Sequence, residues 1–131
     1  MSYLLDTTVF VWILKEPEKL NGRALSLIED ESQDVFFSSV TSWEVVIKFA
    51  IGKLTLPKKP NELLSEIIAK FSFQPLSITH VHSLAVGELP LYHRDPFDRM
   101  LIAQARSENL VLLTADFIFE KYPVQTLWCG K

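Results

Sequence analysis

The sequence predicts an α/β fold with three layers, in which helices cover both faces of a mostly parallel central sheet of four to five strands. One observation behind this prediction is that short apolar runs alternate with longer segments of helical spacing, as in parallel sheets buried on both faces. A second is that two of these runs stop close to an aspartate, Asp6 and Asp116. Parallel sheets bind ligands at the carboxyl ends of their strands, so both acids fall where a site is expected.

The individual elements follow from periodicity and from capping residues. Apolar runs predict strands over 3–5, 35–38, 75–78, 110–114 and 124–128, and helical spacing predicts helices over 21–31, 40–51, 61–71, 79–87 and 96–108. Thr7 or Thr8 can begin a further helix directly after Asp6. Ser39 is the expected N-cap of the 40–51 helix, and Gly52 is its expected end. The absence of a linker and the length of 131 residues predict one domain.

Composition limits the classes of protein that this chain can represent. Its net charge of −3 argues against a protein that coats nucleic acid, because such binders tend to be basic. The single cysteine, Cys129, allows no disulfide within the chain, which fits a reducing cytoplasm. The apolar run at 3–14 is interrupted by Asp6 and follows no basic segment, so we expect neither a signal peptide nor a membrane span.

The stretch HRDPFDRMLIAQA at 93–105 begins with charged residues and continues as an apolar helix. Asp95 is a suitable N-cap because Pro96 then takes the first helical position. Asp98 is different, because it lies in register with Ile102 on the helix face that should pack on the sheet. Burying an unpaired acid is costly, so this position indicates a cleft that holds a cation.

Three further acids stand in similar positions, and each also has a purely structural interpretation. Glu44 interrupts the apolar face of the 40–51 helix and could pair with Lys48, one turn later. Asp6 and Asp116 could each cap the segment that follows them. Together with Asp98, however, these acids come from strand ends and helix starts, which meet at one edge of a parallel α/β sheet.

A cluster of four acids needs compensating positive charge. Two unit charges about 4 Å apart repel each other by roughly 4 kcal/mol at an effective dielectric constant near 20. Protons or a divalent cation would make the cluster tolerable. Carboxylate oxygens select hard metals, so the expected ion is Mg²⁺ or Mn²⁺, which keeps several waters and commonly meets a phosphate substrate.

At these residues the chain resembles a PIN domain and, more closely, the toxin ribonuclease of a VapBC-type toxin–antitoxin pair. The matching pieces are LLDTTVFVW with Asp6, SSVTSWEVVIK with Glu44, HRDPFDRMLIAQA with Asp98 and LLTAD with Asp116. The resemblance covers essentially the whole chain, and it implies a single three-layer PIN-like domain over 1–131 that acts as a Mg²⁺- or Mn²⁺-dependent endoribonuclease. It carries over Asp6, Glu44 and Asp98 as the core metal ligands and catalytic acids, with Asp116 as the fourth.

The resemblance also implies supporting residues and partners. Thr7 and Thr114 match polar positions that line the family's site, whereas position 8 is Thr where the family often has Asn, Ser or His. Asp95 and Arg99 flank the acidic helix start as further support. The implied partners are an RNA substrate, a small antitoxin that wraps the toxin and blocks its cleft, and a second toxin copy in a homodimer.

Two groups of residues could meet those partners or could be purely structural. A basic stretch and two arginines beside the acidic helix start could steer RNA or merely form a solvated surface; they are Lys48, Lys53, Lys58, Lys59, Arg94 and Arg99. Spacing puts Arg99 on a helix face that should be wet. Four bulky residues near the first helices could be core or could form a groove for an antitoxin helix; they are Phe10, Trp12, Trp43 and Phe49. Full burial of all four within one protomer would exclude the groove.

The expected reaction is hydrolysis of an RNA phosphodiester bond. A metal ion would lower the pKa of a bound water and stabilise charge on the phosphate, while an acid not fully engaged with metal orients the water. Aspartyl-phosphate chemistry and receiver-type signalling fit less well, because Thr8 stands where a second acid would be needed beside Asp6. The remaining alternative is a catalytically inactive PIN-like binding or scaffold module, which Mn²⁺ should not stabilise.

Overall fold

The computed structural model describes residues 1–131 and contains one five-stranded sheet. Along the chain the elements are β1 (Ser2–Leu5), α1 (Thr7–Lys15), η1 (Pro17–Lys19), α2 (Gly22–Glu29), β2 (Asp34–Ser38), α3 (Ser39–Ala50), α4 (Pro60–Phe71), β3 (Gln74–Leu76), α5 (His80–Ala85), η2 (Val86–Glu88), α6 (Pro96–Ser107), β4 (Val111–Thr114), η3 (Phe117–Lys121) and β5 (Thr126–Trp128), where η marks a 3-10 helix. The strand order is β3-β2-β1-β4-β5, and every neighbouring pair is parallel. The predicted α/β fold with a parallel sheet is confirmed.

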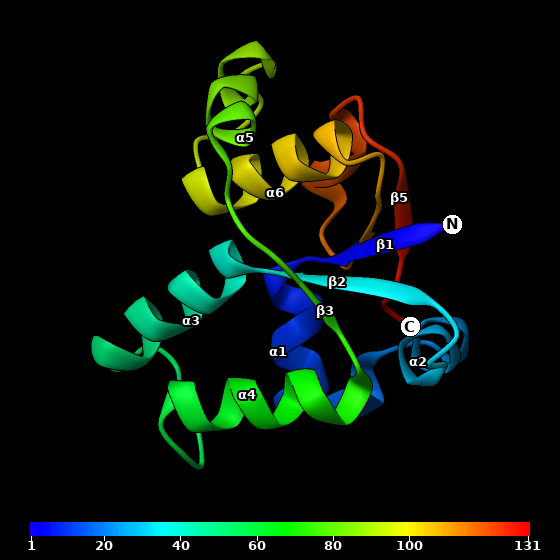
Figure 1. The fold of residues 1–131 in the computed structure, drawn as a ribbon, viewed down its shortest axis with the longest axis vertical. Helices are drawn as coiled ribbons and strands as arrows, with labels where there is room; N and C mark the ends of the chain where they lie inside the picture. The colour runs from blue at the N-terminus through cyan, green and yellow to red at the C-terminus, as the bar shows by residue number, and fades with distance from the viewer.

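The helices form layers on the two faces of the sheet (Figure 1). Helices α5 and α6 lie on one face, and α1, α2 and α4 lie on the other. β1 runs directly into α1 and β2 directly into α3, with one residue and no residue between them. Because β1 and β2 are parallel neighbours, α1 and α3 begin at the same carboxyl edge of the sheet.

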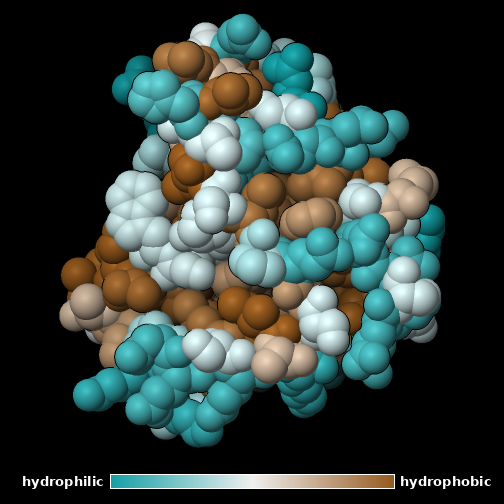
Figure 2. Space-filling view, viewed as in Figure 1, coloured by the Kyte–Doolittle hydropathy of each residue, from teal (hydrophilic) through white to brown (hydrophobic).

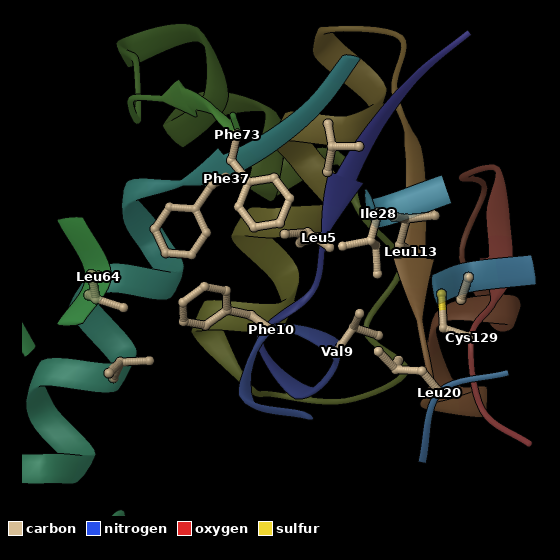
Figure 3. Close-up of a cluster of buried hydrophobic side chains, with 13 residues drawn as sticks. Leu5, Val9, Phe10, Leu20, Ile28, Phe37, Leu64, Phe73, Leu113 and Cys129 are labelled. Atoms are coloured by element: carbon tan, nitrogen blue, oxygen red, sulfur yellow. The ribbon is translucent and has the colours of Figure 1, made fainter. Parts of the chain in front are cut away.

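The alternation of side chains along the strands divides the core into two clusters. Leu5 and Leu113 point into the cluster that α1, α2 and α4 cover, and Figure 3 shows both side chains there. Their neighbours Leu4 and Leu112 point into the other cluster, beneath α6. All four side chains are completely buried, as expected for strands with a period of two residues and helices on both faces.

The aromatic pair Phe10 and Phe37 joins α1 to β2 within the first cluster (Figure 3). Their ring centroids lie 4.5 Å apart at an interplanar angle of 55°. Such tilted pairs add about 0.5–1.5 kcal/mol beyond the burial of apolar area. This contact fixes α1 against the sheet next to the position where Asp6 leaves β1.

Capping residues set most helix boundaries, with one correction to the prediction. Ser38, not Ser39, is the N-cap of α3, since its hydroxyl oxygen accepts the amide hydrogen of Val40. Gly52 follows the end of α3 with a φ of +77°, the left-handed conformation that a helix end favours.

The short helices η1 and η3 were not predicted. None of the helices combines the length and the apolarity that a membrane crossing requires.

Candidate metal centre

A cleft of about 400 Å³ opens at the carboxyl edge of the sheet. Five acids line it: Glu16 after α1, Glu44 from α3, Asp95 and Asp98 from the start of α6, and Asp116 from the segment after β4. Asp6 is only 1% exposed and is not among the residues that line the cleft, but the charge of Asp98 contributes to a raised pKa of Asp6. The predicted gathering of acids from strand ends and helix starts therefore occurs at one edge of the sheet.

The carboxylate of Asp6 has one satisfied and one unsatisfied oxygen. Oδ1 accepts a hydrogen bond of 2.7 Å from the amide of Val9 and so caps α1. Oδ2 is buried and has no hydrogen-bond partner. Burial raises the pKa of Asp6 to about 7, the charge of Asp98 adds to this rise, and the Thr114 hydroxyl and the Val9 amide oppose it. Both interpretations of Asp6, cap and cleft acid, are therefore compatible with its surroundings.

Glu44 shows the same division between its two oxygens. Oε2 lies 2.6 Å from Nζ of Lys48, the partner expected one helical turn later. Oε1 is buried and has no hydrogen-bond partner. The residue is only 4% exposed, whereas the Lys48 side chain is 46% exposed. Glu44 thus forms the predicted pair with Lys48, but its carboxylate is buried and keeps one oxygen without a partner.

Asp95 and Asp98 have different tasks at the start of α6. Oδ1 of Asp95 accepts hydrogen bonds from the amides of Phe97 and Asp98, at 2.9 and 3.0 Å, which confirms Asp95 as the N-cap. Asp98 does not cap the helix, and its half-buried side chain lines the cleft. Burial raises the pKa of Asp98 to about 6; the charges of Asp95 and Glu44 raise it further, and the hydrogen bond from His93 lowers it.

The remaining acid, Asp116, is exposed at the mouth of the cleft. One of its oxygens accepts a hydrogen bond of 3.0 Å from the amide of Ile118 and caps η3. Its own amide donates to the hydroxyl of Thr114 at 3.1 Å, which ties the end of β4 to this turn. Thr7 lines the cleft as well, and its hydroxyl lies 3.1 Å from that of Thr41 on α3.

Most of the basic residues that were considered as RNA-steering groups do not line the cleft. Only Lys48 and Lys53 line the cleft. Lys58 instead pairs with Glu66 on the exposed side of α4. Arg99 does not lie free on a wet face: its Nη1 donates to the Pro90 carbonyl at 2.9 Å and it holds several other groups of the loop before α6. The helical period could not reveal this, because the loop folds back over that face of α6.

The donor set fits a hard divalent ion. Two buried carboxylate oxygens without partners, Asp6 Oδ2 and Glu44 Oε1, are unusual, since nearly all buried polar atoms are hydrogen-bonded. A cation would satisfy both and would offset the mutual repulsion of the acids. No three His, Cys, Asp or Glu side chains are already close enough together to hold an ion. The carboxylates would have to converge on it, and Glu44 would have to give up part of its contact with Lys48.

No pattern in the sequence indicated a role for His93 or Tyr122, which both lie near the acids. Nε2 of His93 lies 3.3 Å from Oδ2 of Asp98, and Nδ1 of the same ring lies 2.7 Å from the hydroxyl of Tyr122. His93 is five residues before Asp98 with a proline between them, so no helical spacing relates the two. Tyr122 lies 29 residues after His93 in the chain, and nothing in the sequence around it indicates that the two side chains are in contact.

The fold and this cleft define an α/β protein with an acidic site at the carboxyl edge of a parallel sheet. The family model described as "PIN domain" matches residues 3–125. The chain therefore belongs to the PIN-domain family, and the family resemblance drawn from the four sequence pieces is confirmed.

Individual relatives are more distant. The chain is similar to Ribonuclease VapC16 of Mycobacterium tuberculosis, with 24% identity over 58 residues; the match takes in 44% of this chain and 41% of that protein, less than half its length. A solved structure of VapBC2 from Rickettsia felis, bound to a DNA fragment from its promoter, has a TM-score of 0.77 at 17% identity and covers 99% of this chain and 100% of that one. DNA-bound VapBC from Salmonella typhimurium has a TM-score of 0.74 at 19% identity, with 98% of each chain covered.

Proposed function

We propose that this protein is a metal-dependent endoribonuclease that hydrolyses RNA phosphodiester bonds. The observation that carries the proposal is the pair of buried, unpartnered carboxylate oxygens of Asp6 and Glu44. Glu44 lines one cleft with Asp98, and the charge of Asp98 in turn raises the pKa of the buried Asp6. An acid set of this kind is costly to bury without a cation. Membership of the PIN-domain family and similarity to a ribonuclease support the same chemistry.

Asp6, Glu44, Asp98 and Asp116 would hold the ion, which we propose to be Mg²⁺ or Mn²⁺ because all the donors are carboxylate oxygens. When bound, such an ion supplies positive charge against the phosphate and a water of lowered pKa.

The exposure of each residue indicates whether it would anchor the ion, orient the water or contact the phosphate. Asp6 and Glu44 are buried, so they are suited to anchoring the ion at the base of the cleft. Asp116 is the exposed member of the set, and only one of its oxygens caps η3. It is therefore best placed to accept a hydrogen bond from the attacking water and to orient it. Thr7 and Thr8 at the cleft wall offer hydroxyls to the phosphate oxygens.

We further propose that the protein is the toxin of a VapBC-type pair and that a small antitoxin covers its apolar surface. Of the four bulky residues considered for this groove, only Phe10 is fully buried, and Trp43 is 56% exposed. Figure 2 shows a band of hydrophobic side chains across the lower half of one face, above the hydrophilic side chains at the bottom. The condition that would have excluded a groove is not met, while Phe10 itself is core.

A homodimer remains part of this proposal and rests on the family resemblance. Size-exclusion chromatography with light scattering on the purified toxin and on the toxin with its antitoxin would give the two masses directly.

One observation favours the alternative of an inactive binding module. No three of the acidic side chains are already arranged around a common point, and Lys48 occupies one oxygen of Glu44. Such a module would show neither metal-dependent cleavage nor a rise in melting temperature with Mn²⁺, whereas any ligand that binds only the folded state must stabilise it.

The direct test is cleavage of a mixed pool of structured RNAs by the purified, antitoxin-free protein. We expect cleavage with Mg²⁺ or Mn²⁺ and none with EDTA. Asp98→Asn should lower the rate at least about 100-fold, because even partners that only orient a metal ligand cost 10–100-fold when removed. Gel analysis of the fragments would measure the rates.

Asp30→Asn is the matched control, since Asp30 lies at the end of α2, outside the cleft, and its carboxylate accepts hydrogen bonds from Ser32 in its own turn. Its cleavage rate should equal that of the unmodified protein. Equal rates for all three proteins would identify a contaminating nuclease or remove Asp98 from the mechanism. No cleavage by any of them, together with no Mn²⁺-dependent stabilisation, would support the binding module.

A further inference from the structure

His93 lies between the proposed metal centre and a fixed network of hydrogen bonds. Its ring packs against Tyr122, with centroids 5.4 Å apart, and against Phe119 in a T-shaped arrangement with centroids 6.5 Å apart. One ring nitrogen faces Asp98 and the other faces the hydroxyl of Tyr122. The side chains of His93 and Asp98 are both only 20% exposed, so solvent competes weakly for this contact.

The hydrogen bonds around Tyr122 determine which nitrogen of His93 carries the hydrogen. The Tyr122 hydroxyl receives hydrogen bonds from the His93 amide at 3.1 Å and from Nη1 of Arg99 at 3.3 Å, and neither group can accept one. Both lone pairs of the hydroxyl are therefore in use, and its hydrogen is left for Nδ1 of His93, 2.7 Å away. Nδ1 is thus an acceptor, so the neutral ring carries its hydrogen on Nε2.

The Nε2 hydrogen points to Oδ2 of Asp98 at 3.3 Å. This contact holds one carboxylate oxygen and leaves Oδ1 of Asp98 for the cleft that the side chain lines. Arg99 keeps the arrangement in place, because its guanidinium also binds the carbonyls of Pro90 and Val86 and so fixes the loop that carries His93. The chain of contacts joins the end of η3, the loop before α6 and the first turn of α6.

We propose that His93 is a positioning residue that orients the Asp98 carboxylate for metal binding, and that Tyr122 fixes the tautomer of His93 needed for this. The inference rests on the proposed function, in which Asp98 is a metal ligand. Hydrogen-bonded partners behind metal ligands fix the orientation of those ligands, and here the partner of a carboxylate is a histidine.

The test measures Mn²⁺ affinity, by following free Mn²⁺ with electron paramagnetic resonance during titration of the metal-free protein. His93→Phe keeps a ring of similar shape but has no hydrogen to donate, and we expect its dissociation constant to rise about 10–100-fold. His93→Gln can place an amide hydrogen near the former Nε2 and should recover most of that loss. Tyr122→Phe removes only the hydroxyl and should raise the dissociation constant several-fold, a change that requires no repacking.

Tyr92→Phe is the matched control, because Tyr92 is 54% exposed and packs against Tyr122 but lies outside the network. Its Mn²⁺ affinity should be unchanged. Thermal melting of each metal-free variant shows whether it is folded, and Tyr122→Phe decides the matter if His93→Phe does not fold.

Asp98→Asn, measured alongside, separates the two possible failures. If Asp98→Asn loses Mn²⁺ binding while His93→Phe or Tyr122→Phe binds as the unmodified protein does, the positioning role is wrong and the metal site stands. If Asp98→Asn itself binds Mn²⁺ normally, the proposed ligand set is wrong and the role of His93 falls with it. Equal losses in His93→Phe and His93→Gln would also overturn the positioning role, because the donated hydrogen would then not matter.

Discussion

At the scale of the residue, Asp6 caps α1 from a buried position, whereas the cation binding proposed for it requires a charged carboxylate. Burial raises its pKa to about 7, whereas the same group in the unfolded chain titrates near 3.8. The folded protein therefore holds a proton that the unfolded chain releases. The resulting contribution to stability is fully present below about pH 4 and is lost as the pH rises through about 7.

We predict that the free energy of unfolding of the metal-free protein falls between pH 4 and pH 8. Asp6 lowers it by roughly 1.4 kcal/mol for each pH unit over which the folded protein holds the proton and the unfolded chain does not. Asp98, with a pKa raised to about 6, acts in the same direction. Asp6→Asn should remove most of the decrease, because the amide does not ionise. Urea denaturation with EDTA at several pH values measures this, and an equally steep decrease in the variant would contradict it.

The contact between Lys48 and Glu44 predicts a trade-off between stability and metal binding. Lys48→Met leaves the buried charge of Glu44 without its partner, so we expect the metal-free protein to lose about 1–3 kcal/mol of stability. The same change frees Oε2, so Mn²⁺ should raise the melting temperature of the variant more than that of the unmodified protein. Calorimetry with and without Mn²⁺ tests both statements.

Lys58→Met provides the control for this effect. Lys58 pairs with Glu66 at nearly the same distance, 2.7 Å, but both side chains are about half exposed. Exposed pairs of this kind contribute under about 1 kcal/mol. A loss in Lys58→Met equal to that in Lys48→Met would show that burial of Glu44 is not the cause.

At the scale of the element, the local sequence predicted which helices and strands exist better than it predicted the residues at which they begin and end. All five strands appear, and Asp95 with Pro96 begins α6 as its sequence indicated. The N-cap of α3 moved by one residue, because Ser38 and Ser39 are chemically alike and only the packing of the chain distinguishes them. η1 and η3 escaped prediction because 3-10 turns leave no long hydrophobic period.

The end of α3 depends on one glycine. Gly52 has a φ of +77°, and a Cβ atom there would meet nothing within 4 Å. Gly52→Ala should therefore destabilise the protein through backbone conformation alone, by about 1 kcal/mol. Urea denaturation would measure this loss.

Gly87→Ala serves as the comparison, since Gly87 also has open space but lacks a positive φ. It should be neutral or slightly stabilising, because alanine restricts the unfolded chain. Equal effects of the two substitutions would mean that the left-handed conformation at Gly52 carries no cost.

At the scale of the whole molecule, topology explains why the acids could be predicted together and the residues behind them could not. Asp6 and Asp116 follow parallel strands, so any such sheet brings them to one edge. His93 meets Asp98 and Tyr122 only because the loop before α6 folds back against the end of η3. The course of this loop depends on tertiary contacts such as those of Arg99, and the spacing of residues in the sequence does not predict such contacts.

If the protein cleaves RNA as proposed, its net charge of −3 opposes the approach of the substrate. Lys53 lines the acidic cleft, whereas the exposed Lys59 lies at the start of α4 outside it. If the cleft binds the RNA backbone, Lys53→Gln should raise KM for a cleaved RNA with little change in kcat. It should also reduce the slope of log(kcat/KM) against log salt by about 1, the effect of losing one phosphate contact.

Lys59→Gln is the control, because it changes the net charge by the same amount at a position outside the cleft. It therefore distinguishes a contact within the cleft from attraction by the charge of the whole molecule. Steady-state kinetics at several salt concentrations would decide: equal effects of the two substitutions would assign RNA attraction to the net charge of the molecule and not to the cleft.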